Sequence, residues 1–341
     1  GHGNKLATTY RLVLVGKAGY RRPVSTPSFG SAGASNRLAL PVDALLPEAL
    51  ALLHQRRRLV FTAEPGAGKT TRLPPFVAAH PEESGQVLVL EPRRLAARLS
   101  AERVAVEQGF SVGKEVGYIT KFERRVSADS KIVFVTEGIL TRRLVKDREL
   151  RGVTTVVLDE FHERHVASDL ALSLLLRLQR ASRPDLKIVV MSATVDAAML
   201  SELLDAPHLH CEGRLYPVEI VHAAATGDRP LESLVASAIF ETLRRGDRRD
   251  LLVFLPGMRE IRRAQSQAER LAREHDLALL PLHGTLSPQE QDAALRPNAR
   301  RKVIFATNVA ETSLTIEGVG HVIDSGLANI PSHSPWSGLP I

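Results

Sequence analysis

The stretch AEPGAGKTT, residues 63–71, decides the fold because it joins a short apolar strand, RLVFTA, to a helical segment. It follows the phosphate-binding pattern G-x-x-x-x-G-K-[ST], with Ala63 in place of the first glycine. Gly66 and Gly68 let backbone N–H groups curl around phosphate oxygens, and the start of the helix adds a favourable dipole. We expect Lys69 to reach the outer phosphates of a nucleotide and Thr70 to offer its hydroxyl to Mg²⁺. The predicted nucleotide-binding segment comprises Ala63, Glu64, Pro65, Gly66, Ala67, Gly68, Lys69, Thr70 and Thr71.

The alternative for this segment is a glycine turn with a solvent-facing lysine. The strand before it and the helix after it disfavour that alternative, because they are the context in which the pattern binds phosphate.

Apolar strands alternate with helical stretches downstream of this loop. Strands of that kind, buried on both faces, indicate a parallel, doubly wound α/β sheet. The first series comprises QVLVLEP (86–92), KIVFVTEG (131–138), TTVVLDE (154–160) and LKIVVMSAT (186–194). A second series comprises DLLVFLPG (250–257), LALLPLHG (277–284), RKVIFATN (301–308) and HVIDSG (321–326).

The two series predict two α/β domains in a chain of 341 residues. We expect the first domain to span residues 38–205 and the second to span residues 206–341. The boundary is placed near residues 205–220, where Pro207 and short polar pieces interrupt the series. Residues 1–37 are rich in Gly, Ser, Pro and Arg, and we interpret them as a disordered leader or an added tail outside the fold.

Composition narrows the class of protein. The net charge is +7, but residues 1–36 hold five basic residues and no acid, so the remaining chain carries 7 − 5 = +2. The net positive charge is therefore weak support for a polyanionic partner. The single cysteine, Cys211, excludes an intramolecular disulfide and suits a reducing, cytoplasmic location. No segment approaches the roughly 20 apolar residues of a membrane span.

The stretch VVLDEFHERH, residues 156–165, places Asp159 and Glu160 at the end of an apolar strand. In an open parallel sheet, that end faces the ligand crevice. We expect Asp159 to hold Mg²⁺, and Glu160 to orient and deprotonate the water that attacks a phosphate. A solvated acidic pair that merely closes the strand is the alternative.

His162 and His165 are three residues apart and could share one helical face. A zinc site needs three or four ligands, and Cys211 lies far away in the sequence. The sequence therefore disfavours zinc at this position.

Taken together, the motifs are similar to those of a DExH-box helicase of superfamily 2, and more narrowly to the DEAH/RHA group. GAGKTT, DEFHERH and SAT (192–194) stand in the family's order. EPRRLAARLSAERVA resembles its motif Ia, TEGIL its motif Ib, FLPG followed by MREI its motif IV, and TNVAETSLTIEGV its motif V. The resemblance covers residues 38 to 341 and implies two RecA-like domains, ATP and Mg²⁺ as ligands, and single-stranded nucleic acid as the partner, RNA more than DNA.

The resemblance also implies roles for individual residues. Lys69, Thr70, Asp159 and Glu160 keep the roles given above, and His162 would couple the nucleotide site to the other domain. Ser192, Thr194 and Glu311 would link hydrolysis to movement of the strand. An arginine would contact adenine, and Arg93, Arg94 and Arg103 remain open as candidates. The nucleic-acid contacts would come from Arg93, Lys121, Phe122, Thr136, Thr285 and Thr307.

One departure bears on activity. The family's motif VI, Q-R-x-G-R-x-G-R, is expected after SGLP, but the sequence ends at Ile341. That motif supplies arginine fingers worth roughly 10³–10⁵ in rate. We therefore expect a fragment that binds nucleotide weakly and hydrolyses it poorly.

The sequence thus predicts an ATP-dependent helicase or translocase core that moves along single-stranded RNA or DNA. Two alternatives stay open. One is a non-enzymatic module that uses ATP as a switch for binding RNA or protein, and the other is a P-loop kinase of small molecules.

Overall fold

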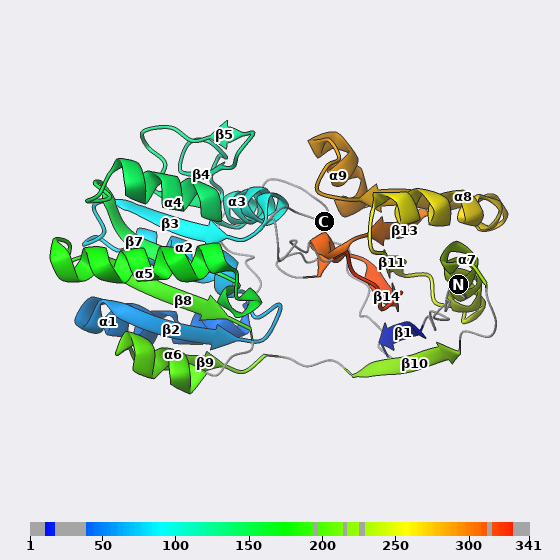
Figure 1. Ribbon diagram of the computed structural model, residues 1–341, viewed down its shortest axis with the longest axis horizontal. Helices are drawn as coiled ribbons and strands as arrows, with labels where there is room; N and C mark the ends of the chain where they lie inside the picture. Colours follow the sequence, from blue (N-terminus) through cyan, green and yellow to red (C-terminus); the bar gives the residue numbers. More distant parts are fainter. Residues whose placement is uncertain are drawn as a thin grey trace, which may run out of the picture. The chain divides into compact units, whose positions relative to one another are not determined.

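The computed structural model describes residues 11–17, 39–193, 197–213, 217–224, 229–311 and 316–329. These residues form two compact units (Figure 1). One unit is Thr26–Leu215, and the other combines Gly1–Ser25 with Tyr216–Ile341. No helix of the described ranges has both the length and the apolar character needed to cross a bilayer.

The unit Thr26–Leu215 is built on an eight-stranded sheet in the order β5-β4-β6-β3-β7-β8-β2-β9. All neighbouring strands are parallel except β4 and β5, which are antiparallel. The central strands are buried along their length, as the aliphatic pattern predicts. The strands are β2 (Arg58–Ala63), β3 (Gln86–Glu91), β4 (Val116–Ile119), β5 (Arg124–Arg125), β6 (Ile132–Thr136), β7 (Val153–Leu158), β8 (Lys187–Ser192) and β9 (His208–Cys211).

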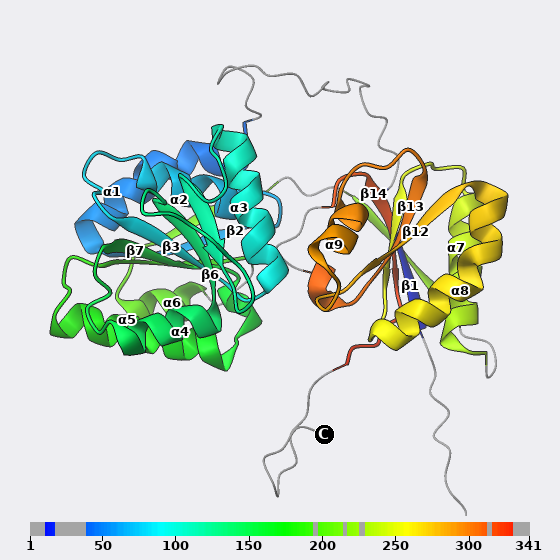
Figure 2. The same ribbon diagram turned by 90° about the horizontal axis from the view of Figure 1, so that it is seen from above.

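Helices cover both faces of this sheet, which gives the three layers seen in Figure 2. One face packs against α1 (Leu46–Arg56), α2 (Lys69–Ala78) and α3 (Arg94–Gln108). The opposite face packs against α4 (Glu137–Lys146), α5 (Val166–Ala181) and α6 (Ala197–Leu204). Two short 3₁₀ helices, η1 (Pro41–Leu45) and η2 (Phe161–Glu163), complete the unit. The predicted doubly wound α/β architecture is confirmed.

The second unit has a six-stranded sheet in the order β10-β1-β14-β11-β13-β12. Its strands β11 to β14 are mutually parallel, and the helices α7 and α8 bury their apolar residues against them. The strands are β1 (Arg11–Lys17), β10 (Val218–Ala224), β11 (Asp250–Phe254), β12 (Leu277–Leu282), β13 (Arg301–Ala306) and β14 (Val319–Asp324). The helices are α7 (Leu231–Arg244), α8 (Met258–His275), α9 (Pro288–Leu295) and the 3₁₀ helix η3 (Asn308–Ala310).

Strand β1 departs from the sequence interpretation, which left residues 1–37 outside the fold. Residues 11–17 pair antiparallel with β10 along the whole strand and with β14 over residues 13–16. The strand thus completes hydrogen bonds that these two neighbours would otherwise leave open. The rest of the leader, residues 1–10 and 18–37, lies outside the described residues.

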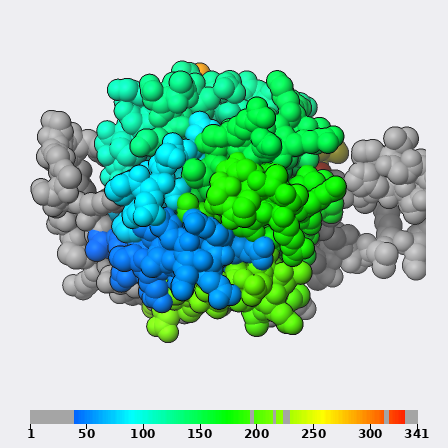
Figure 3. All heavy atoms as spheres, turned by 90° about the vertical axis from the view of Figure 1, so that its left-hand side faces the viewer, coloured from blue at the N-terminus to red at the C-terminus, as the bar shows by residue number. Residues whose placement is uncertain are grey.

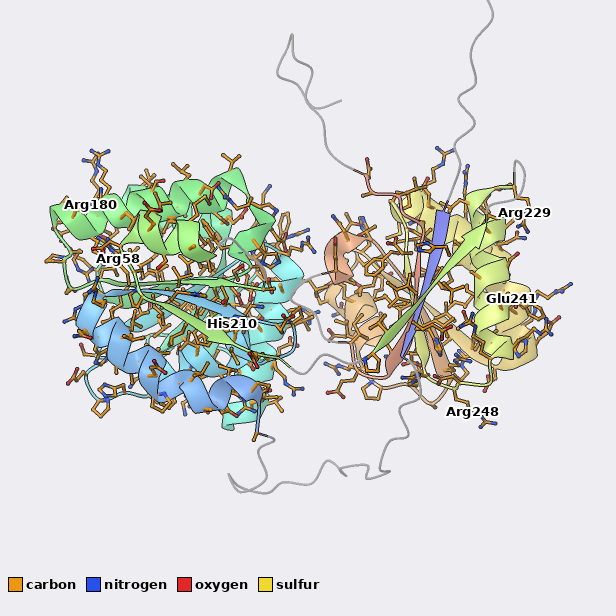
Figure 4. The ribbon with its side chains drawn as sticks, turned by 90° about the horizontal axis from the view of Figure 1, so that it is seen from below. Arg58, Arg180, His210, Arg229, Glu241 and Arg248 are labelled. Carbon is orange, nitrogen blue, oxygen red and sulfur yellow. The ribbon has the colours of Figure 1, made fainter. Side chains whose placement is uncertain are left out.

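The first compact unit extends to Leu215, inside the range 205–220 in which the sequence places the boundary. The reason is β9, which extends the first sheet by pairing with β2. His208 and His210 of β9 both contact the Thr62 hydroxyl, at 2.7 and 2.9 Å, and Figure 4 labels His210 on this edge strand. At the start of β2, Arg58 donates to the Leu204 carbonyl at 2.7 Å and so ties α6 to the same edge.

A buried ion pair lies at the end of the sheet where the strands begin. Lys187 Nζ lies 2.6 Å from Glu83 Oε1, and the Glu83 side chain is fully buried. Burial raises the pKa of Glu83, but the hydrogen bond and charge of Lys187 together with hydrogen bonds from Thr154 and His54 outweigh this effect, so the pKa lies below its usual value. The pair therefore stabilises the fold above the ordinary carboxyl range, and this stabilisation is lost as the pH falls.

Replacing Lys187 with methionine is expected to lower the free energy of unfolding at pH 7 by about 3–5 kcal/mol, because Glu83 keeps its burial without its partner. Urea denaturation measures the loss, and Lys131→Met at an exposed lysine is the matched control. The difference between Lys187→Met and the wild type should shrink on acidification, as Glu83 becomes neutral. A loss that stayed constant with pH would mean that packing, and not charge, is the cause.

Candidate nucleotide-binding site

The phosphate-binding loop runs from the end of β2 to Lys69, the first residue of α2. Gly66 and Gly68 have φ angles of 81° and 97°, in the left-handed region that favours glycine. A Cβ atom on Gly68 would also lie 2.5 Å from Leu40 Cδ1. Ala63, by contrast, is the last residue of β2 and has no positive φ, so its methyl group is compatible with the loop. This explains why alanine can stand in the first glycine position.

The predicted partners of the loop meet it at the carboxyl ends of β2 and β7. Lys69 Nζ lies 3.3 Å from Glu160 Oε1. The Thr70 hydroxyl donates a hydrogen bond to Asp159 Oδ2, and the Glu160 amide donates to Asp159 Oδ1 at 2.8 Å. Glu160 itself adopts a φ of 50°, an unusual conformation that is common where backbone strain serves a site. Residues 90 positions apart thus form one charged cluster.

The electrostatics of this cluster favour an added cation. Burial lowers the pKa of Lys69, but the Asp159 and Glu160 carboxylates reverse the effect, and the net pKa is raised. Burial raises the pKa of Asp159 to about 6, and Glu160 adds to the rise while Lys69 opposes it. The single positive charge of Lys69 does not neutralise the negative charges of Asp159 and Glu160. A hydroxyl and a carboxylate oxygen, from Thr70 and Asp159, are donors that suit Mg²⁺.

Glu91 belongs to the same cluster, although the sequence analysis did not single it out. It ends β3 and is fully buried. The Ser100 hydroxyl donates to its Oε1 at 3.1 Å, while its Oε2 has no hydrogen-bond partner among the described residues. Burial first, and then the charges of Asp159 and Glu160, raise its pKa well above the usual value. The only sequence signal was its position at the end of a buried strand, which it shares with Asp159.

The raised pKa of Asp159 predicts a pH dependence. Below about pH 6 the Asp159 carboxyl holds a proton that a metal ion must displace. The affinity for ATP with Mg²⁺ is therefore expected to fall roughly tenfold when the pH is lowered from 7.5 to 5. Isothermal titration calorimetry measures this, with Asp159→Asn as the control for protonation of ATP itself. A profile that is the same in wild type and Asp159→Asn would contradict the assignment.

His162 lies between Glu160 and the SAT stretch. Its Nδ1 is 3.4 Å from Glu160 Oε2, and the Ala193 amide donates to the same nitrogen at 3.4 Å. Ser192, one residue earlier, is buried at the end of β8. Thr194 lies outside the described residues. The contacts of His162 are compatible with the predicted coupling role.

His165, which had no role in the sequence analysis, connects segments that follow neighbouring strands at one sheet edge. Its Nδ1 lies 2.9 Å from Glu137 at the start of α4, and its Nε2 lies 3.4 Å from Glu163. Glu163 also accepts a hydrogen bond from Arg93 at 3.0 Å. Within the described ranges, neither His162 nor His165 belongs to a group of three potential metal ligands.

An exposed aromatic residue lies among several of the predicted nucleic-acid contacts. The Phe122 side chain is 68% exposed. The Arg94 guanidinium lies 4.8 Å from its ring centre, and the Lys121 ammonium lies 5.4 Å away. Arg93 and Thr136 are the residues that precede α3 and α4, at the same carboxyl edge of the sheet.

The three candidates for the adenine contact lie in different surroundings. Arg93 pairs with Glu163, and Arg94 lies over Phe122. Arg103 pairs with Glu107 on α3 at 2.6 Å. The choice among the three stays open.

In the second unit, the remaining predicted contacts lie at the carboxyl ends of paired strands. Thr285 follows β12, and its hydroxyl lies 2.8 Å from His283 Nδ1. Thr307 follows β13 and precedes η3. Glu311 lines a cavity of about 270 Å³ together with Phe254 and Asp324.

Both units match known families. The DEAD/DEAH box helicase family matches residues 47–203, and the helicase conserved C-terminal domain matches residues 230–335. The chain is 44% identical over 305 residues to the ATP-dependent RNA helicase HrpB of Escherichia coli (strain K12), across 88% of this chain and 37% of that protein. It is 36% identical over 308 residues to the probable ATP-dependent RNA helicase DHR2 of Saccharomyces cerevisiae, across 86% of this chain and 42% of that protein.

Solved structures agree with these matches. The crystal structure of the Escherichia coli DEAH/RHA helicase HrpB superimposes with a TM-score of 0.80 at 42% identity. The match covers 89% of this chain and 39% of that one. The chain therefore spans about two fifths of the length of the relatives it matches.

Proposed function

Since the chain belongs to the DEAD/DEAH box helicases, we propose that it carries the ATP-hydrolysing core of an RNA helicase of the DEAH/RHA group. The observation that carries this proposal is the cluster in which Lys69 contacts Glu160 and Thr70 contacts Asp159. The cytoplasm is the proposed location, in keeping with a single cysteine, Cys211, that is buried and unpaired.

The chain's own groups can perform the main steps of hydrolysis. The amides of the 63–71 loop and the Lys69 ammonium bind the phosphates of ATP. A phosphate that binds Lys69 competes with Glu160 for the ammonium and so frees the Glu160 carboxylate. Glu160 then orients a water and takes its proton as the water oxygen bonds to the γ-phosphorus and the β–γ bridge oxygen leaves with ADP.

Thr70 and Asp159 would hold Mg²⁺ in this site. When bound, the ion neutralises charge on the β- and γ-phosphates. Asp159 is placed for this role because its Oδ1 is fixed by the Glu160 amide while its Oδ2 faces Thr70.

The proposed strand-binding surface lies at the carboxyl edge of each sheet. In the first unit, Arg93, Arg94 and Lys121 supply charge for phosphates, and Phe122 supplies an exposed ring for a base. In the second unit, Thr285 and Thr307 supply hydroxyls for the sugar–phosphate backbone. Such contacts hold the backbone and one stacked base, so base sequence should matter little. RNA is the proposed strand.

Strand displacement tests the proposal. The full-length protein, given an RNA duplex with a single-stranded tail, is expected to release the shorter strand with ATP and not with ADP. Release that is independent of ATP, or absent while ATP is hydrolysed, would overturn the helicase assignment.

Replacing Phe122 with alanine is expected to weaken binding of a single-stranded RNA by about 1–3 kcal/mol, the contribution of one stacked base. Fluorescence anisotropy of a labelled RNA measures the change. Phe110→Ala is the matched control, since Phe110 is also exposed but follows the far end of α3. Equal losses in the two variants would remove Phe122 from the proposed surface.

A further inference from the structure

A second group of potential metal ligands lies at the opposite end of the first sheet from the nucleotide site. His54 is in the last turn of α1, and His80 and Glu82 lie in the connection between α2 and β3. Each offers one ligand atom, and these atoms lie within 4.8 Å of one another. Figure 3 views the molecule from the side at which the strands of this unit begin, with α1 in blue on the surface. We propose that His54, His80 and Glu82 bind a zinc-class transition-metal ion.

A buried carboxylate orients His54. Glu83 Oε1 lies 3.2 Å from His54 Nε2 and is itself held by Lys187 at 2.6 Å. A carboxylate that accepts the far N–H of a ligating histidine is the usual support of such a ligand, because it fixes both the tautomer and the ring orientation. With Nε2–H directed at Glu83, the lone pair of Nδ1 is left to face the surface.

The contact between His54 Nδ1 and the Glu82 carboxylate requires a positive charge. His54 Nδ1 lies 3.1 Å from Glu82 Oε2. In the tautomer set by Glu83, this contact brings a nitrogen lone pair against a carboxylate oxygen. Two acceptors at this distance are stable only when a cation lies between or beside them. A proton on Nδ1 would satisfy the contact, and so would a metal ion.

The position of His80 favours a metal ion over a proton at His54 Nδ1. Its ring lies edge-on to that of His54, with 4.7 Å between ring centres. Two imidazoles held this closely beside a carboxylate match the ligands that Zn²⁺ takes in open sites with three protein ligands. Zinc–ligand distances of about 2.0–2.1 Å put tetrahedral ligands roughly 3.3 Å apart, close to the observed Nδ1 to Oε2 separation.

The surroundings also allow a metal ion to enter. The Glu82 side chain is 73% exposed and that of His54 is 20% exposed. A fourth position would therefore open to water. Nitrogen-rich donors of this kind suit zinc-class ions, whereas Mg²⁺ and Ca²⁺ prefer oxygen ligands alone.

Zinc binding is measured on metal-stripped protein without nucleotide, by calorimetry and by the thermal shift that zinc produces. We expect one Zn²⁺ per chain and a rise in Tm with zinc concentration. His80→Gln should abolish the zinc-dependent rise while leaving the Tm of the metal-free protein unchanged. His275→Gln, at an exposed histidine that ends α8, is the matched control and should behave as the wild type.

Two further measurements test whether His54, His80 and Glu82 bind the ion. Co²⁺ in place of zinc should give the intense visible absorption of a tetrahedral site in wild type and lose it in His80→Gln. Glu82→Gln, at an exposed side chain, should weaken zinc binding at least tenfold without unfolding the protein. An absent zinc response in the wild type, or an equal response in His80→Gln, would show that His54 is held by a proton and would overturn the proposal.

Discussion

Replacing Glu160 with glutamine is expected to lower ATP turnover by the full-length protein by about 10²–10⁴-fold, the usual contribution of a general base. Glutamine keeps the size of the side chain and an oxygen that can accept from Lys69, which lies 3.3 Å away in the wild type. It cannot take the proton of the attacking water. ATP affinity should therefore change little, and phosphate release and nucleotide binding are measured on the same preparation.

Glu91→Gln is the comparison for this variant. Glu91 is a buried glutamate of the same cluster, and burial and the charges of Asp159 and Glu160 raise its pKa, which favours the neutral form that glutamine resembles. The change should lower turnover far less than Glu160→Gln does. If the two variants were equally impaired, the loss would reflect the charge of the cluster as a whole and not a base at Glu160.

Replacing Lys69 with alanine is expected to weaken ATP binding by about 2–5 kcal/mol, as for other truncations of one partner in a buried charge pair. The ammonium is the nearest cation to Asp159 and Glu160, and it lowers the pKa of Asp159. Without the Lys69 ammonium, the negatively charged phosphates of ATP would approach the carboxylates of Asp159 and Glu160, and the loop would supply no side-chain positive charge to offset them. Anisotropy of a fluorescent ATP analogue measures the affinity.

Lys114→Ala serves as the control for Lys69→Ala, because Lys114 is exposed and pairs with its neighbour Glu115. It should bind ATP as the wild type does. Unchanged binding in Lys69→Ala would show that the 63–71 loop is not the phosphate site.

The main features of the fold and site were predictable because they rest on local patterns and one rule of topology. Aliphatic runs ending in Ala63, Asp159 and Ser192 predict parallel strands, and parallel strands end at one edge of a sheet. That rule alone brings Lys69 to Glu160 across 91 positions. The spacing of glycines in the loop predicts the left-handed conformations that Gly66 and Gly68 adopt.

Other features depend on pairing and burial, which no local pattern specifies. Burial beside two acids that are distant in sequence raises the pKa of Glu91. His165 is positioned by Glu137 and Glu163, which come from different strand ends. Strands β1 and β9 are placed by partners far away in the chain, so the pairing of residues 11–17 with the second sheet could not be assigned from composition.

Whether ATP hydrolysis at this site drives movement along RNA is tested most directly by the rate of ATP turnover. The rate is measured on the full-length protein with single-stranded RNA, with single-stranded DNA and with no polymer. We predict turnover that rises with RNA, rises less with DNA, and is lost in Glu160→Gln under every condition. A rate that is the same with and without polymer, in protein that binds ATP, would contradict the central claim that this site drives movement along a strand.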